Sequence, residues 1–242
     1  MILSTHGIIG SSGGSGSGSP FLTNLYAVYK AESNANDSLG FYNGTAQGGL
    51  TYSTGKSGNA FTFNGTNAYV QLPVGTFTSF TSDFSLNVWV YYVNNSDIQT
   101  IFSSFSTDGV TQKGFSLFIN TNVIRLAISS GSNPRVDLVS TTVLTNNTWY
   151  NIGVVRKGST SSKIYINGVL DCQNTNSINP SYYTNAHPAI GILDYTNNYG
   201  GQYYPMGVNS KIDELNIWNK ELTLTEVTTL YNSGTGKFYP TF

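Results

Sequence analysis

The chain has 242 residues, of which only 10% are charged, and a formal net charge of −1 from 11 basic and 12 acidic side chains. Because lysine and arginine are not clustered, the charge pattern excludes nucleic-acid binding through phosphates and electrostatic docking on a membrane. No stretch reaches the ~18 apolar residues of a membrane span, and a single cysteine, Cys172, excludes an internal disulfide.

A run of glycine and serine separates the start of the chain from the rest. Residues 1–10 read MILSTHGIIG, and residues 11–20 contain glycine and serine up to a final proline. Such a tether behaves as a random coil with an r.m.s. span of roughly 17 Å. We interpret residues 1–10 as an anchoring peptide, 11–20 as a tether and 21–242 as the folded domain; the alternative for the tether is an engineered linker. The anchoring side chains are Ile2, Leu3, Ile8 and Ile9.

The first ten residues can also be compared with the pattern of a signal peptide. It lacks a basic n-region, and its apolar run is interrupted by His6 and too short for a good h-region. We therefore expect no signal peptide.

Downstream of the tether, short runs of alternating apolar and polar residues indicate β-strands. They lie at residues 60–65, 68–73, 84–92, 123–129, 163–171 and 211–219. Alternation predicts which side chains share a face: Phe84, Leu86, Val88 and Val90 in one run, and Ile124, Leu126 and Ile128 in another.

The last two runs carry further signals. Asn167-Gly168 lies between two apolar runs, which strongly favours a β-hairpin turn. In residues 211–219, strict alternation predicts that Asp213, Leu215 and Ile217 share one face.

One helix is predicted, near the C-terminus. Thr223 and Glu226 have the spacing of a capping box, and Gly234 can end the helix. Val227, Leu230 and Tyr231 form an apolar stripe that should pack on a sheet. Many short strands, one helix and no βαβ rhythm predict an all-β fold, an antiparallel two-sheet sandwich of the jelly-roll type.

Four segments between residues 25 and 234 carry motifs in a fixed order. The first joins N-x-N-D-S-x-G at 34–40, G-x-A-F-x-F-N-G at 58–65 and Y-V-x-L-P at 69–73. The others are F-S-x-x-x-W-V at 84–90, W-x-x-I with I-Y-x-N-G between 149 and 168, and I-D-E-L-x-I-W-N-x-x-L-x-x-x-E-V at 212–227. Together they resemble the laminin G-like branch of the concanavalin A-type jelly rolls, over nearly the whole domain but not over residues 1–20.

The resemblance implies a concanavalin A-like jelly roll and a candidate calcium site. In that family the acid of the opening loop and the acid of the closing strand often share one ion. These acids correspond to Asp37 and Asp213, with the Asn43 side chain or carbonyls completing the oxygen ligands that Ca²⁺ prefers. The alternative is structural: Asp37 makes an Asx-turn, and Asp213 accepts hydrogen bonds from that loop.

Catalysis is not expected. Retaining glycosidases need two carboxyl groups ~5–5.5 Å apart, and the E-x-D-x-x-E string that jelly-roll members of that class use is absent. Of the two histidines, His6 lies in the anchoring peptide and His187 precedes a proline without a nearby acid–nucleophile set.

Residues 182–204 concentrate tyrosine among asparagine and glycine, a composition that suits a ligand surface. Aromatic faces stack on sugar C–H bonds, and amides pair with sugar hydroxyls; the same side chains also suit a protein contact or an ordered loop over a sheet edge. The candidate ligand residues are Tyr195, Asn197, Asn198, Tyr199, Tyr203 and Tyr204.

An anchoring peptide, a tether and a lectin-like domain resemble in their arrangement the head-decoration, head-fibre and tail-fibre proteins of bacteriophages. We expect a non-enzymatic virion component, multicopy or homo-oligomeric, that docks on virion proteins through residues 1–20 and displays its domain towards host-surface glycans. One alternative is a purely structural virion adaptor or decoration protein without glycan binding. The other is a secreted carbohydrate-binding module.

Overall fold

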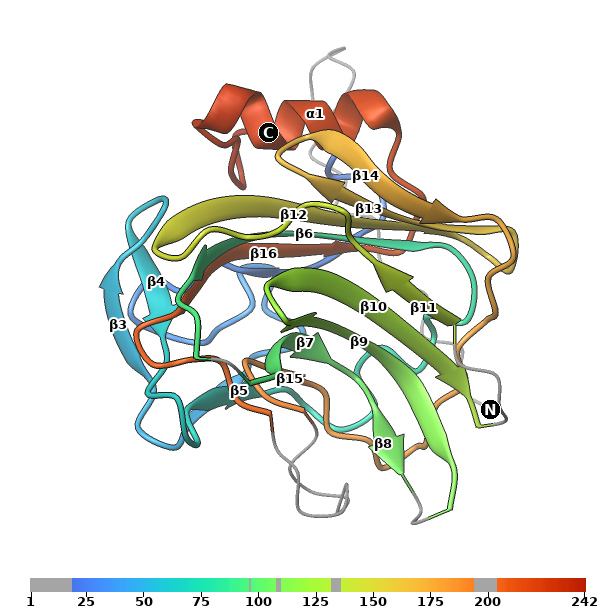
Figure 1. Cartoon of the computed structure of the whole chain (residues 1–242), viewed down its shortest axis with the longest axis horizontal. Helices are drawn as coiled ribbons and strands as arrows, with labels where there is room; N and C mark the ends of the chain where they lie inside the picture. Colours follow the sequence, from blue (N-terminus) through green and yellow to red (C-terminus); the bar gives the residue numbers. More distant parts are fainter. Residues whose placement is uncertain (1–18, 96, 108–109, 132–135, 194–203) are drawn as a thin grey trace.

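The computed structural model describes residues 19–95, 97–107, 110–131, 136–193 and 204–242. Within them the chain forms two packed antiparallel sheets, with one helix outside the first sheet (Figure 1). This arrangement confirms the predicted all-β jelly-roll sandwich with a short C-terminal helix. No helix among the described residues has the length and hydropathy of a membrane span.

Each sheet contains eight of the described strands. In sheet A they follow the order β14 (Val169–Asn174), β13 (Ser161–Ile166), β12 (Thr148–Lys157), β6 (Phe84–Tyr92), β16 (Lys211–Trp218), β4 (Asn59–Thr62) and β3 (Thr51–Thr54), and β1 (Leu25–Tyr29) pairs with β16. In sheet B the order is β11 (Val136–Val139), β10 (Val123–Ser130), β9 (Gln112–Asn120), β7 (Gln99–Ser103), β15 (Ala189–Ile190), β5 (Tyr69–Gln71) and β2 (Thr45–Gln47), and β8 (Ser106–Thr107) pairs with β9.

The main core lies between the two sheets and follows the period-two pattern of the strands. In β6, Phe84, Leu86, Val88 and Val90 are fully buried in this core, as Ile124, Leu126 and Ile128 are in β10. The predicted faces of both strands are therefore confirmed. Each such side chain contributes about 1.5–3 kcal/mol by leaving water.

The Asn167-Gly168 turn joins β13 to β14 as predicted. Both residues have positive φ, 52° and 75°, which is the conformation of the two-residue turn that matches the twist of antiparallel strands. Asn167 also accepts a hydrogen bond from the Asn151 N–H through its Oδ1 at 3.0 Å, so the turn is tied to β12.

The prediction for β16 is wrong at Asp213, because a β-bulge interrupts the alternation. Asp213 pairs with Trp89 of β6, while Asn216 pairs with Asn87, so three steps along β16 match two along β6. The extra residue keeps Leu215 in the core but places Asp213 beside Trp89, on the outer face of sheet A.

Helix α1 (Leu224–Tyr231) covers part of that outer face (Figure 1). The capping box is present, since the Thr223 hydroxyl accepts from the Glu226 N–H and the Glu226 side chain accepts from the Thr223 N–H. The helix packs on sheet A through a second apolar cluster made of Phe21, Val155, Tyr165, Trp218, Leu222, Val227, Leu230 and Phe242. Its end differs from the prediction: Asn232, in the left-handed region, is the C-cap, and Gly234 ends a following 3₁₀ turn.

The same cluster joins the two ends of the described domain. The rings of Phe21 and Phe242 lie 5.2 Å apart, and the Trp218 indole N–H donates to the Phe21 carbonyl at 2.7 Å. The first and last described segments therefore meet beside one buried tryptophan.

Candidate functional site

A small pocket opens on the outer face of sheet B. It has a volume of about 140 Å³ and is lined by Ile98, Thr100, Phe105, Ser116, Phe118, Leu193 and Tyr204. The lining combines three aromatic rings and two aliphatic side chains with the hydroxyls of Thr100, Ser116 and Tyr204.

Strand β9 forms the floor of this pocket. Its inward residues Phe115, Leu117 and Ile119 fill the core, so the alternate residues Ser116 and Phe118 face outward. In register with them lie Ser103 and Thr100 of β7, and a bulge between Thr100 and Phe102 adjusts that strand. The pocket therefore has a rigid base of two paired strands.

Tyr204 closes one side of the pocket. The Thr100 N–H donates to the Tyr204 carbonyl at 3.1 Å, which fixes this residue next to β7. Tyr204 also packs with Ile98 against a small cluster of Phe105, Phe118, Ala127 and Leu193. Of the predicted ligand residues it is the one that the structure describes; Tyr195, Asn197, Asn198, Tyr199 and Tyr203 lie outside the described residues.

The other lining residues were not among the sequence candidates. Phe118 alone carries a local signal, because it is a large apolar residue at an outward position of an alternating strand. Ile98, Phe105 and Leu193 come from separate segments, so their convergence depends on the tertiary fold. Arg125 is the cross-strand partner of Phe118 and places a guanidinium on the same face.

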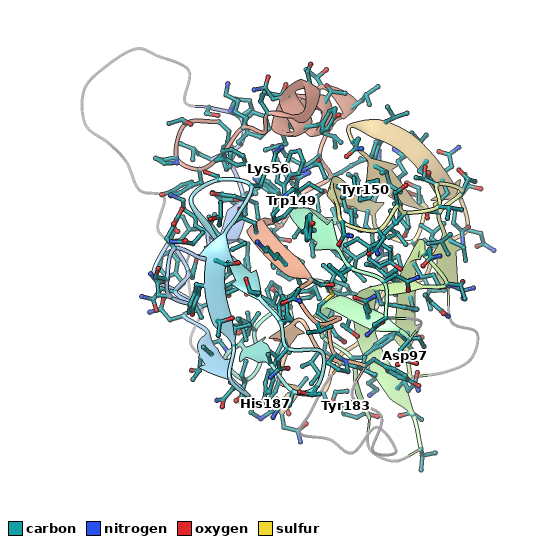
Figure 2. The ribbon with its side chains drawn as sticks, turned by 60° about the vertical axis from the view of Figure 1, so that its left-hand side comes forward. Lys56, Asp97, Trp149, Tyr150, Tyr183 and His187 are labelled. Carbon is teal, nitrogen blue, oxygen red and sulfur yellow. The ribbon has the colours of Figure 1, made fainter. Side chains whose placement is uncertain are left out.

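The polar groups of the pocket are hydroxyls. Among the described residues, its lining contains no carboxylate, histidine or cysteine. His187 is the histidine that the structure describes, and its Nδ1 pairs with the Gln71 amide at 3.1 Å. It lies at the end of the molecule opposite α1 (Figure 2).

Asp37, a predicted calcium ligand, has a structural role in this fold. Its Oδ1 accepts hydrogen bonds from the N–H groups of Val28 and Leu39, and its Oδ2 accepts from Phe41 and Tyr42, at 2.9–3.2 Å. The bond from Leu39, two residues on, is the Asx-turn that was the alternative. Four N–H donors occupy the lone pairs of this buried carboxylate.

The other two predicted calcium ligands are engaged separately. Asn43 Oδ1 accepts from the Asp37 N–H at 3.1 Å, and Asp213 Oδ2 accepts from the Lys56 and Ser57 N–H groups at 2.7 and 3.0 Å. The described residues contain no group of three or more acidic, histidine or cysteine side chains arranged for a metal. All three side chains already accept hydrogen bonds within the chain, and calcium binding at these residues stays a prediction.

The bulge in β16 buries two acids with incomplete hydrogen bonding. Asp213 and Glu214 are both 0% exposed, and Asp213 Oδ1 and both Glu214 carboxylate oxygens have no hydrogen-bond partner among the described residues. Burial raises the pKa of Asp213 to about 7, although the N–H groups of Ser57 and Lys56 oppose the shift. Burial, and to a lesser extent the Asp213 charge, raises the pKa of Glu214 to about 8.

The predicted anchoring residues Ile2, Leu3, Ile8 and Ile9 lie outside the described residues.

Residues 64–228 match the model of a laminin G family within the concanavalin A-like lectin/glucanases superfamily. The chain belongs to this family. The matched region begins at the turn after β4 and includes the strands that form the pocket, together with most of α1.

Several proteins of known sequence or structure are similar to this laminin G-like chain. A protein of Enterococcus sp. (strain 3G1_DIV0629) described as botulinum-like toxin eBoNT/J is 30% identical over 168 residues, which are 64% of this chain and 12% of the toxin. Domain 4 of AbnA, a GH43 extracellular arabinanase from Geobacillus stearothermophilus, solved in complex with arabinotriose, is 26% identical; the match covers 85% of this chain and 97% of that one, with a TM-score of 0.67.

The fold is also shared with the binding domain of botulinum neurotoxin serotype D. That structure is 16% identical over 87% of this chain and 52% of its own, with a TM-score of 0.66. The laminin G-like chain therefore spans about half of such toxin binding domains and 12% of the Enterococcus toxin.

Proposed function

We propose that the protein is a non-enzymatic, lectin-like domain that binds a glycan in the pocket on sheet B. The observation that carries this proposal is the lining itself, which combines the rings of Phe105, Phe118 and Tyr204 with the hydroxyls of Thr100 and Ser116. Aromatic faces attract the polarised C–H bonds of a sugar ring, while hydroxyl groups exchange hydrogen bonds with sugar hydroxyls.

The size of the pocket limits its ligand. About 140 Å³ is below the ~300–1,000 Å³ of pockets that enclose drug-sized ligands. The pocket therefore suits a single sugar ring at the end of a glycan or a side branch.

The comparisons support the ligand class. Domain 4 of the arabinanase was solved with arabinotriose bound, and it is similar to this chain over nearly its whole length. We therefore choose arabinotriose as the first probe, with a panel of other neutral and sialylated oligosaccharides beside it.

Two substitutions in the full chain test the pocket. We expect Tyr204→Ala and Phe118→Ser to weaken binding of the best oligosaccharide at least tenfold, because each removes an aromatic face from the lining. Isothermal titration measures the affinity. Since Phe118 is largely buried, Tyr204→Ala is the decisive variant if the serine variant is unstable.

A matched control is Val169→Ala, which shortens an apolar side chain that is 68% exposed on sheet A. It should bind as the unmodified chain does. Unchanged affinity in Tyr204→Ala would place the glycan elsewhere, and no saturable binding to any member of the panel would favour the purely structural alternative.

For residues 1–20 we propose a role in attachment to a phage virion. The support is the sequence itself, a ten-residue segment with the apolar side chains of Ile2, Leu3, Ile8 and Ile9, followed by a glycine and serine tether. Multiple copies on one particle would convert weak glycan contacts into avidity.

Deleting residues 1–10 tests this role. We expect the deletion to abolish cosedimentation with the phage particle while the melting temperature changes little, because the described members of the apolar clusters all lie within residues 21–242. Full occupancy of the particle by the shortened protein would rule out the anchoring role.

The similarity to an arabinanase domain favours a second candidate function, a carbohydrate-binding module of a secreted enzyme system. Both candidates use the same pocket. They differ in the partner of the chain, which is a virion protein in the first and a catalytic domain in the second.

A further inference from the structure

A row of aromatic, basic and hydroxyl side chains crosses the outer face of sheet A. Trp149 of β12 pairs in register with Tyr91 of β6, which pairs with Lys211 of β16. Lys211 pairs in turn with Thr62 of β4, and Thr62 with Thr51 of β3. Five strands therefore contribute one residue each, and the row is roughly 19 Å long at the usual strand spacing.

These side chains face away from the core. The residues that flank them along the strands, Val90, Tyr92, Tyr150, Ile212 and Phe61, all lie in the core between the sheets, so the row occupies the opposite face. All five members retain exposure. Trp149 lies on the side of the molecule that carries α1 (Figure 2).

The two rings and the lysine form one contact surface. The rings of Trp149 and Tyr91 lie 5.5 Å apart, and the Lys211 ammonium sits 5.7 Å from the Tyr91 ring centroid. The Lys211 ammonium also donates to the Thr54 carbonyl at 2.8 Å, which holds the side chain in place. In the neighbouring row, the Lys56 ammonium lies 4.4 Å over the ring of Trp89.

The charge of this face is positive at its surface. Lys56 and Lys211 are partly exposed, whereas the acids beside them, Asp213 and Glu214, are fully buried. Glu32, the other acid near the β3–β4 hairpin, uses its carboxylate to accept the Asn59 N–H at 3.1 Å. The five strands that carry the row therefore present ammonium groups and no exposed carboxylate.

We propose that Trp149, Tyr91, Lys211, Thr62 and Thr51 form a second saccharide-binding surface, which takes a linear glycan bearing carboxylate groups. The aromatic rings stack on the sugar C–H faces, Lys211 pairs with a carboxylate and the threonine hydroxyls bond sugar hydroxyls. The open row lies on the opposite sheet from the pocket and shares no residue with it.

The chain supplies its own reporter for this surface. It has three tryptophans, of which Trp89 and Trp218 are 2% and 0% exposed. Quenching of tryptophan fluorescence by acrylamide therefore reports mainly on Trp149.

The experiment titrates the full chain with tetragalacturonic acid and, separately, with its methyl ester. We expect the acid to protect Trp149 from acrylamide and to bind more weakly as salt rises. The neutral ester should bind at least tenfold more weakly, because it lacks the carboxylates that Lys211 pairs with.

Two variants complete the test. Lys211→Gln keeps a donor for the Thr54 carbonyl but loses the charge, and it should weaken binding of the acid about tenfold without changing the weak binding of the ester. Trp149→Ala should abolish measurable binding of the acid. Tyr204→Ala, in the pocket on sheet B, should leave it unchanged, so the two sites fail separately.

Equal affinity for acid and ester, or full binding of the acid by Lys211→Gln, would overturn the proposal. So would binding of the acid that leaves Trp149 fully open to acrylamide. A melting curve of each variant identifies losses caused by unfolding, and Lys211→Gln remains informative if Trp149→Ala is unstable.

Discussion

Glu214 has an unusual set of surroundings for a carboxyl group. Its side chain is fully buried without a hydrogen-bond partner among the described residues, and its φ is 49°, in the left-handed region. Asp213, with one unpartnered oxygen, is adjacent, and the Asn216 amide donates to the Glu214 carbonyl at 2.9 Å. Burying charge without a partner is costly, so these carboxyl groups favour the protonated form.

This preference makes stability depend on pH. Because the pKa values of Asp213 and Glu214 are raised to about 7 and 8 in the folded protein, the folded state holds protons that the unfolded chain releases above pH ~4–4.5. The stability that these two groups contribute is therefore complete below pH ~4 and is lost as the pH rises through 7 to 8. For each proton that the folded state holds and the unfolded chain does not, the free energy of unfolding falls by up to about 1.4 kcal/mol per pH unit.

Glu214→Gln tests this dependence. We expect the variant to be more stable than the unmodified protein at pH 8, because it removes a buried carboxylate, and to lose less stability between pH 5 and 8. Urea unfolding at several pH values measures both quantities. Glu221→Gln is the control, since Glu221 forms ion pairs with Lys157 and Lys163 at the surface; parallel pH profiles for the unmodified protein and Glu214→Gln would contradict the interpretation.

At the scale of elements, one carboxylate organises the loop between β1 and β2. Asp37 receives its four N–H donors from β1 and from residues 39–42 of its own loop. Asp37 also forms an isolated bridge with Tyr29. The Asp37 side chain thus adds to the backbone contacts that tie the loop to β1, such as the bond from the Ser38 N–H to the Val28 carbonyl at 2.8 Å.

Asp37→Asn should destabilise the protein without any involvement of metal. An amide has one oxygen in place of two, so two of the four N–H groups lose their acceptor, at about 1–3 kcal/mol each. A fall of about 2–6 kcal/mol in the free energy of unfolding is expected. If the role of Asp37 is purely structural, a chelator should leave the melting temperature of the unmodified chain unchanged.

The exposed acid Asp97 supplies the comparison, and Asp97→Asn should be nearly neutral. If chelator lowers the melting temperature of the unmodified chain, an ion contributes to folding after all, and the calcium prediction gains support.

Much of the element pattern could be predicted from the sequence, because it depends on local rules. The alternation in β6 and β10, the turn at Asn167-Gly168 and the capping box at Thr223 each involve neighbours along the chain. The bulge at Asp213 could not be predicted, since it appears only when β16 is paired with β6. The same is true of the pocket, which joins Phe118 of β9 to Leu193 and Tyr204 from distant segments.

For the molecule as a whole, sheet A and sheet B present two different surfaces. The outer face of sheet B has a small apolar pocket, while the outer face of sheet A has the open row of aromatic and basic side chains beside α1. Because the core lies between the sheets, the two surfaces point in opposite directions (Figure 1). If both bind saccharides, one molecule can hold two different glycans at once.

The meeting of Phe21 and Phe242 beside Trp218 has a practical consequence for protein engineering. Because the two ends leave the sandwich at neighbouring points, the whole unit can be spliced into an exposed loop of an unrelated carrier without pulling that loop apart. A display scaffold built in this way would present both faces, with its two junctions together at one corner of the inserted unit.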